Sequence, residues 1–83
     1  MNQQFKLILY YRSGCGLCEE MQAELFTEQS QHGFELETID VDSSEALVAQ
    51  FGHKVPVLTS ATGEEICHYF LDHSALADCF SGG

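Results

Sequence analysis

Two cysteines separated by two residues, Cys15 and Cys18, are the residues of this chain best suited to chemistry. Their thiols can close a small disulfide ring and reopen it, and a thiolate is both a nucleophile and a metal ligand. The Cys-Gly-Leu-Cys motif follows an apolar run at 5–11 and opens a helical pattern. In a protein that is not secreted, this placement favours a redox site over a structural disulfide.

The expected helix start controls how reactive Cys15 is. Free backbone N–H groups and the positive end of the helix dipole favour a negative sulfur there. This interaction is worth about 0.3–2 kcal/mol and lowers the pKa of the thiol from about 8.5 toward about 7. Glu19 and Glu20 oppose the effect, and Arg12 in the preceding loop offsets part of their charge. We therefore expect a moderately activated nucleophile at Cys15, with the more deeply buried Cys18 as the resolving thiol.

A metal site is the main alternative for the two thiols. A structural zinc ion needs four protein ligands, and the chain has no second Cys-x-x-Cys motif. His53, which precedes the Val-Pro pair, is the histidine placed to approach the first motif. The remaining cysteines, Cys67 and Cys79, lie in apolar segments and are expected to be small buried residues. No metal is expected.

The elements that position the motif follow from periodicity and from turn residues. Leu17, Met21 and Leu25 recur at helical spacing and are joined by Phe26, while Gly33 marks the helix end. Strands are expected at 5–11, 34–39, 55–59 and 65–69, and helices from 15 or 17 to 31, at 45–51 and at 72–80. The segment 40–42 is expected to cap the second helix, Asp72 the third, and 81–83 to fray.

The predicted order β-α-β-α-β-β-α indicates one α/β domain over residues 1–83. A strand followed by a crossover helix returns as a parallel strand, whereas the short turn at 61–64 closes an antiparallel hairpin. We therefore expect a four-stranded mixed sheet flanked by helices.

Composition limits the partners that this domain is expected to have. Asp and Glu number 13 against 3 Lys and Arg, a formal net charge of -10, which argues against nucleic acid and anionic membranes. Neutral or cationic protein surfaces are better candidates. The start at 1–4 lacks the basic region of a signal peptide, and no apolar run reaches the roughly 20 residues of a membrane span. A soluble, cytoplasmic monomer is expected.

The element order, the Cys-x-x-Cys motif after the first strand and Val55-Pro56 at the third strand together resemble the thioredoxin fold. The stretch 10–18, Tyr-Tyr-Arg-Ser-Gly-Cys-Gly-Leu-Cys, is similar to small bacterial glutaredoxin-like proteins. The resemblance implies a thiol–disulfide oxidoreductase acting on a protein or small-molecule disulfide. It also implies that Pro56 is cis and faces the disulfide, and that Val55 presents its backbone to an extended substrate. The substrate-binding residues expected are Val55, Pro56, Arg12, Gly16 and Leu17.

One departure from glutaredoxins concerns the ligand. Their Gly-Gly pair after the fourth strand, which holds glutathione, is replaced here by Tyr69-Phe70-Leu71, followed by Asp72. Bulky residues do not allow the close backbone approach that glycine allows. Glutathione binding of the usual kind is therefore not expected, and no cofactor is predicted. The same segment motivates a second hypothesis, an adaptor module with weak or no redox activity. A third is binding of a metal ion or an iron–sulfur cluster by Cys15 and Cys18 of two chains.

Overall fold

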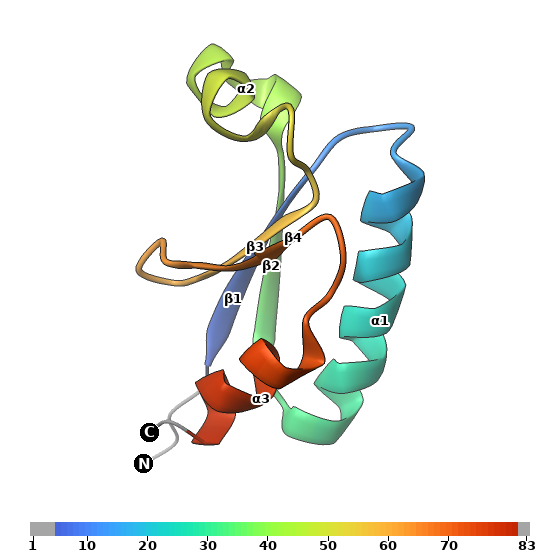
Figure 1. The fold of residues 1–83 in the computed structure, drawn as a ribbon, viewed down its shortest axis with the longest axis vertical. Helices are drawn as coiled ribbons and strands as arrows, with labels where there is room; N and C mark the ends of the chain where they lie inside the picture. The colour runs from blue at the N-terminus through green and yellow to red at the C-terminus, as the bar shows by residue number, and fades with distance from the viewer. Residues whose placement is uncertain (1–4, 82–83) are drawn as a thin grey trace.

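The computed structural model describes residues 5–81, which fold in the predicted order. In chain order the elements are β1 (Lys6–Tyr11), α1 (Gly16–His32), β2 (Glu35–Asp40), the 3-10 helix η1 (Val41–Ser43), α2 (Glu45–Phe51), β3 (Val57–Ser60), β4 (Glu65–His68) and α3 (His73–Ser81) (Figure 1). Of the end predicted to fray, Ser81 is still helical, and 82–83 lie outside the described residues. None of the helices in this described part is both long and apolar enough to cross a membrane.

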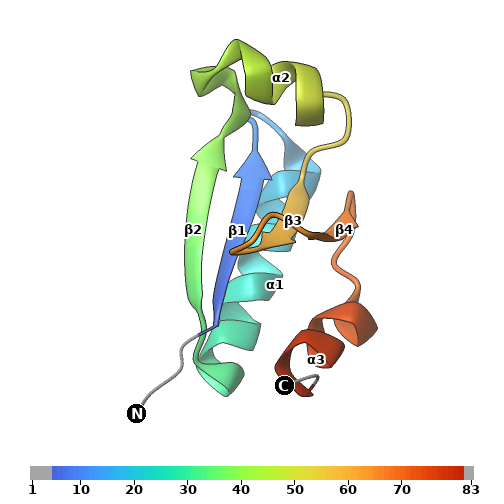
Figure 2. The same cartoon turned by 90° about the vertical axis from the view of Figure 1, so that its left-hand side faces the viewer.

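The strands form one mixed sheet in the order β2-β1-β3-β4. β1 and β2 are parallel, with Tyr11 opposite Asp40, and β3 is antiparallel to both β1 and β4. Because α1 carries the chain back between two parallel strands, the C-terminal ends of β1 and β2 point the same way (Figure 2). The Cys-x-x-Cys motif follows β1, so it lies at this end of the sheet, where open α/β sheets commonly hold their functional loops.

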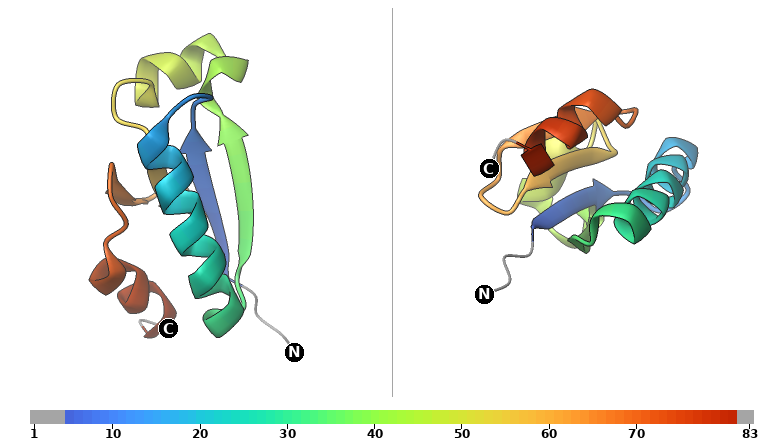
Figure 3. Two further views of the ribbon diagram at one scale, coloured as in Figure 1. Left: turned by 90° about the vertical axis from the view of Figure 1, so that its right-hand side faces the viewer. Right: turned by 90° about the horizontal axis from the view of Figure 1, so that it is seen from below.

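The main core lies between the sheet and one side of α1. Alternate residues of β1, Leu7 and Leu9, are buried on the same face, as the period of a strand requires. They pack in one cluster with Met21 and Leu25 of α1, which lies across the sheet in Figure 3. The prediction that Phe26 joins this helix face is wrong, because its side chain is 54% exposed. Phe26 is roughly 100° further around the helix than Leu25, which turns it away from the sheet.

A second, smaller core forms between α2 and the adjoining end of the sheet. Figure 2 shows α2 at the C-terminal ends of β1 and β2. The ring of Tyr10 stacks on that of Phe51, with 4.3 Å between the ring centroids. Val41 and Val57 are fully buried beneath this pair. The pairing fixes the short helix on the sheet, and thereby the loop that leads from α2 into β3.

The helix ends differ from the sequence prediction in detail. Gly33 ends α1 with a φ of 68°, and its N–H donates to the carbonyl of Gln29 at 2.9 Å, so the helix runs one residue past the predicted end at Gln31. Asp40 does not cap α2. Its carboxylate accepts from the N–H of Asp42 and starts η1, whereas Ser44 caps α2. Because a turn of 3-10 helix separates β2 from α2, the residue that caps α2 lies further along the chain than predicted.

Candidate active site

Cys15 and Cys18 form a disulfide bond at the start of α1, with their Cα atoms 5.2 Å apart. Cys15 is the N-cap of the helix, and its Sγ accepts the N–H of Cys18 at 3.1 Å. Gly14 makes the sharp turn from β1 into the helix with a φ of 76°, a conformation that favours glycine. A sulfur at this position meets free backbone N–H groups, and these stabilise a negative charge.

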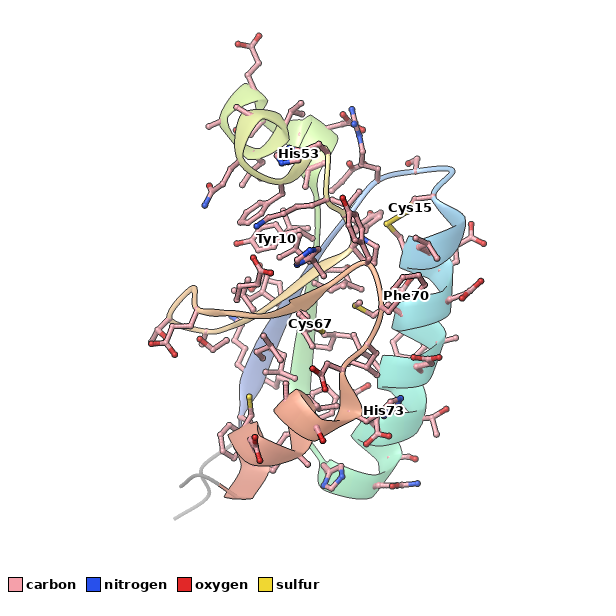
Figure 4. All side chains as sticks on the ribbon, in the orientation of Figure 1. Tyr10, Cys15, His53, Cys67, Phe70 and His73 are labelled. Atoms are coloured by element: carbon pink, nitrogen blue, oxygen red, sulfur yellow. A yellow bond between two sulfur atoms is a disulfide. The ribbon has the colours of Figure 1, made fainter. Side chains whose placement is uncertain are left out.

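The two sulfurs differ in their access to solvent. Cys15 is half-buried, whereas Cys18 is only 3% exposed and is one of the buried residues of α1. Figure 4 places Cys15 at the top of α1. Gly16 is exposed at the first helical position, and Leu17 is half-buried between the two cysteines. An incoming substrate can therefore reach Cys15 more readily than Cys18.

Arg12 is held by residues far away in the sequence. Its Nε and Nη2 donate to the two carboxylate oxygens of Asp42 at 3.2 and 2.8 Å, and its Nη1 donates to the carbonyl of Gly52 at 3.2 Å. The hydrogen bond from Arg12 lowers the pKa of the Asp42 carboxyl. Because its charge is already paired with Asp42, we expect Arg12 to offset Glu19 and Glu20 less than the sequence indicated. Its predicted role toward substrate stays a prediction.

The Val55–Pro56 peptide bond is cis, as the resemblance implied. These two residues precede β3 rather than opening it, so the strand begins two residues later than predicted and ends one residue later, at Ser60. Pro56 is buried, and half-buried Val55 packs on the core below α2. The carbonyl of Pro56 accepts the N–H of Tyr69 at 2.9 Å, which joins this loop to the segment after β4.

Tyr69 was predicted inside the last strand but lies in a tight turn beyond it. The N–H of Phe70 donates to the carbonyl of His68 at 2.7 Å, which closes a three-residue turn. Tyr69 occupies the centre with a φ of 67°, unusual for a residue that is not glycine. Its hydroxyl donates to the carbonyl of His53 at 3.0 Å. The turn leaves Phe70 66% exposed, against α1 and below Cys15 in Figure 4.

The remaining thiols lie apart from the motif. Cys67 is buried as predicted, and burial raises the pKa of its thiol. Cys79 is only half-buried, which corrects the prediction, and it lies near the C-terminal end of α3. Within residues 5–81, no three or more His, Cys, Asp or Glu side chains are grouped so that they could hold a metal ion. His53 lies at the end of α2 (Figure 4).

Sequence reasoning missed Asp42 as the partner of Arg12. The signal was available in the predicted topology. Parallel pairing places Tyr11 opposite Asp40, so the residues that follow the two strands meet at the same sheet end. A basic residue after one strand and an acidic residue after the other are then neighbours.

Comparison with known proteins places this geometry in a family. A family model described as "Glutaredoxin-like domain (DUF836)" matches residues 6–81. An uncharacterised protein of Mycobacterium tuberculosis is 33% identical over 73 residues, covering 82% of this chain and 74% of its own length.

Solved structures agree with this family model. The solution NMR structure of protein Ne2328 from Nitrosomonas europaea is 41% identical, covers 96% of this chain and 95% of its own, and superposes with a TM-score of 0.86. A mutant thioredoxin from Halobacterium salinarum is 28% identical, with coverages of 96% and 74% and a TM-score of 0.66. The fold is therefore thioredoxin-like, and the chain belongs to the glutaredoxin-like domain family.

Proposed function

We propose that this protein is a thiol–disulfide oxidoreductase that uses Cys15 as nucleophile and Cys18 as resolving thiol. The observation that carries the proposal is the disulfide-bonded pair at the start of α1, in which one sulfur is accessible and the other is buried. The accessible sulfur also accepts a backbone N–H at 3.1 Å, a contact that favours its thiolate form.

The reaction proceeds in two exchanges that require no cofactor. The Cys15 thiolate attacks one sulfur of the substrate disulfide, a new S–S bond forms, and the other substrate sulfur leaves as a thiolate that takes a proton from water. Cys18 then loses its proton to solvent and attacks Cys15, which closes the ring and releases the second substrate thiolate. The substrate gains two electrons, the protein dithiol loses two, and an external thiol reductant must restore it.

Val55 and Pro56 are proposed to orient the substrate chain. Among the described residues, no backbone hydrogen bond outside the regular helices and strands involves the N–H or C=O of Val55. These groups are available to an extended peptide, in the manner of an added strand. Glutathione is not proposed as the ligand of the usual kind, because the bulky side chains of Tyr69 and Phe70 replace the glycines that would admit it.

The test is reduction of a disulfide substrate by single-cysteine variants. Cys15→Ser is expected to abolish reduction, whereas Cys18→Ser is expected to stop at a mixed disulfide that mass spectrometry detects. Cys79→Ser is the matched control and should keep the wild-type rate. A redox titration with alkylation counting gives the potential of the Cys15–Cys18 pair. A wild-type protein that reduces neither insulin nor glutathione-coupled disulfides would overturn the proposal.

The adaptor hypothesis is favoured by one observation, the exposed ring of Phe70 beside the motif. An exposed aromatic residue on a small domain is a frequent anchor of protein interfaces. A partner complex of this kind should survive Cys15→Ser and be lost in Phe70→Ala, as measured by co-purification of both variants. Loss of the complex in Cys15→Ser alone would point back to a mixed disulfide.

A further inference from the structure

A groove begins beside the Cys-x-x-Cys motif and follows α1 away from it. Its volume is about 250 Å³, and one wall is the segment after β4. The lining residues are Leu17, Glu20, Met21, Glu24, Tyr69, Phe70, Leu71 and His73. Because Leu17 lies between the two cysteines, a chain bonded to Cys15 can continue directly into this groove.

The outer wall of the groove is apolar and held in place. Tyr69 donates its N–H to the carbonyl of Pro56 at 2.9 Å and its hydroxyl to the carbonyl of His53 at 3.0 Å. Phe70 is 66% exposed at the rim, and Figure 4 shows it beside α1. These hydrogen bonds hold the backbone turn that carries Phe70, and an aromatic side chain exposed beside a reactive sulfur is suited to contact an apolar side chain of a docked polypeptide.

The helix wall of the groove is acidic, and no Lys or Arg neutralises it. Glu20 and Glu24 line it, and the nearest basic group is His73, whose Nε2 lies 3.9 Å from Glu24. The chain has only 3 Lys and Arg. Each is paired elsewhere, in the ion pairs Lys6–Glu37, Arg12–Asp42 and Lys54–Glu65. The carboxylates of the groove are therefore left to attract a cation from outside.

The rise of α1 and the length of an extended peptide indicate how far such a cation lies from the bonded cysteine. With a rise of about 1.5 Å per helical residue, Glu20 and Glu24 lie about 7.5 and 13.5 Å along α1 from Cys15. An extended chain advances about 3.3 Å per residue, so these distances correspond to about two to four residues of a bound peptide.

We propose that this groove docks a protein substrate whose reactive cysteine is followed, within about two to four residues, by an apolar residue and a Lys or Arg. The cysteine bonds to Cys15, the apolar side chain contacts Phe70 and Leu17, and the cation stands beside Glu20 and Glu24. This inference rests on the proposed oxidoreductase function and adds the class of substrate. The attraction between the substrate cation and the two glutamates is electrostatic, so it weakens as salt screens the charges.

The experiment uses three peptides that differ only in the residue three positions after a single cysteine: Lys, Gln or Glu. Each is oxidised to its symmetric disulfide dimer and mixed with the reduced full-length protein. The reaction is quenched with acid, and the released peptide thiol is counted by chromatography. At low salt, the Lys peptide should react about three- to tenfold faster than the Glu peptide, and the difference should shrink as salt is added.

Selectivity is compared as the ratio of the Lys and Glu rates within each variant, so that changes in the reactivity of Cys15 cancel. Glu20→Gln/Glu24→Gln should bring the ratio close to one. The control Glu45→Gln/Glu64→Gln removes the same charge from α2 and the hairpin and should keep the wild-type ratio. Phe70→Ala should slow all three peptides, whereas Phe26→Ala, which removes an exposed ring from the same helix that lines the groove, should not.

The outcomes separate the inference from the function on which it rests. If no peptide is reduced, the oxidoreductase proposal is wrong. If all three are reduced at equal rates, the function stands and the docking inference is overturned. If both double variants lose selectivity equally, the preference belongs to the net charge of the protein and not to this groove, which also overturns the inference.

Discussion

The left-handed conformation of Tyr69 leads to a prediction with an unusual sign. At most exposed positions, glycine is less stabilising than alanine by about 0.5–1 kcal/mol, because it loses more backbone freedom on folding. At a φ of 67°, however, a Cβ atom is disfavoured. The cost is about 1–2 kcal/mol for an L-residue. Tyr69→Gly should therefore be more stable than Tyr69→Ala, by about 0.5–1 kcal/mol after the backbone entropy is subtracted.

Comparing these two variants isolates the backbone, because both lack the ring and its hydroxyl bond to His53. Tyr69→Phe removes only that exposed bond and should cost no more than about 1 kcal/mol. The matched control is Ala49→Gly, on the exposed side of α2. Here glycine should be the less stable residue, and the free energy of unfolding should fall by about 1 kcal/mol.

Urea unfolding of the four variants measures these differences. Thermal unfolding provides a second readout, because 1 kcal/mol shifts the midpoint of a domain this size by about 4–8 °C. The glycine variant should then melt about 2–8 °C above the alanine variant. If Tyr69→Ala is as stable as Tyr69→Gly, while Ala49→Gly behaves normally, the turn does not impose the conformation described.

Three further predictions concern packing, charge and thiol reactivity. Leu25→Ala should destabilise the fold by about 2–5 kcal/mol in urea unfolding, because its side chain is fully buried. The hydrogen bond from Lys54 lowers the pKa of Glu65 from its ordinary value of 4.5, so the stabilisation is complete above about pH 4.5 and is lost as the pH falls below it. Unfolding measured over pH should show Glu65→Gln converging on the wild type in acid, and a constant difference would contradict this. Burial raises the pKa of both remaining thiols, but Cys67 is buried and Cys79 only half-buried, so iodoacetamide should modify Cys67 more slowly in the native protein, and mass spectrometry should find equal rates only after unfolding.

The sequence was sufficient for the elements whose signal is local. The spacing of Met21 and Leu25 predicts the buried face of α1, and Gly33 predicts its end to within one residue. The place of Cys15 at the helix start follows from the same pattern. These features depend on neighbours within a few positions along the chain, where periodicity and capping operate.

Contacts between distant segments were harder to predict. The pairing of Arg12 with Asp42 depends on strand register, and the exposure of Phe70 depends on where a turn begins. Tyr69 carries the residue type of a strand, yet it adopts a conformation that its own side chain disfavours. Local propensity predicts a strand there, and only the hydrogen bond to Pro56 and the packing around it reveal the turn.

The acidic surface acts on both the nucleophile and its substrate. Glu19, in the first turn of α1, and Glu20, the next residue, disfavour a negative sulfur on Cys15, whereas the guanidinium of Arg12 is paired with Asp42 and compensates less. In the proposed complex, the cation of the substrate stands beside Glu20 and supplies the missing positive charge. The N–H of Cys18 meanwhile keeps its contact with Cys15. Docking a cationic chain therefore favours the attacking thiolate as well as the encounter, and selectivity arises in the reaction step too. We expect this acidic surface to repel a small anionic disulfide such as oxidised glutathione, which agrees with our proposal that glutathione is not the ligand of the usual kind.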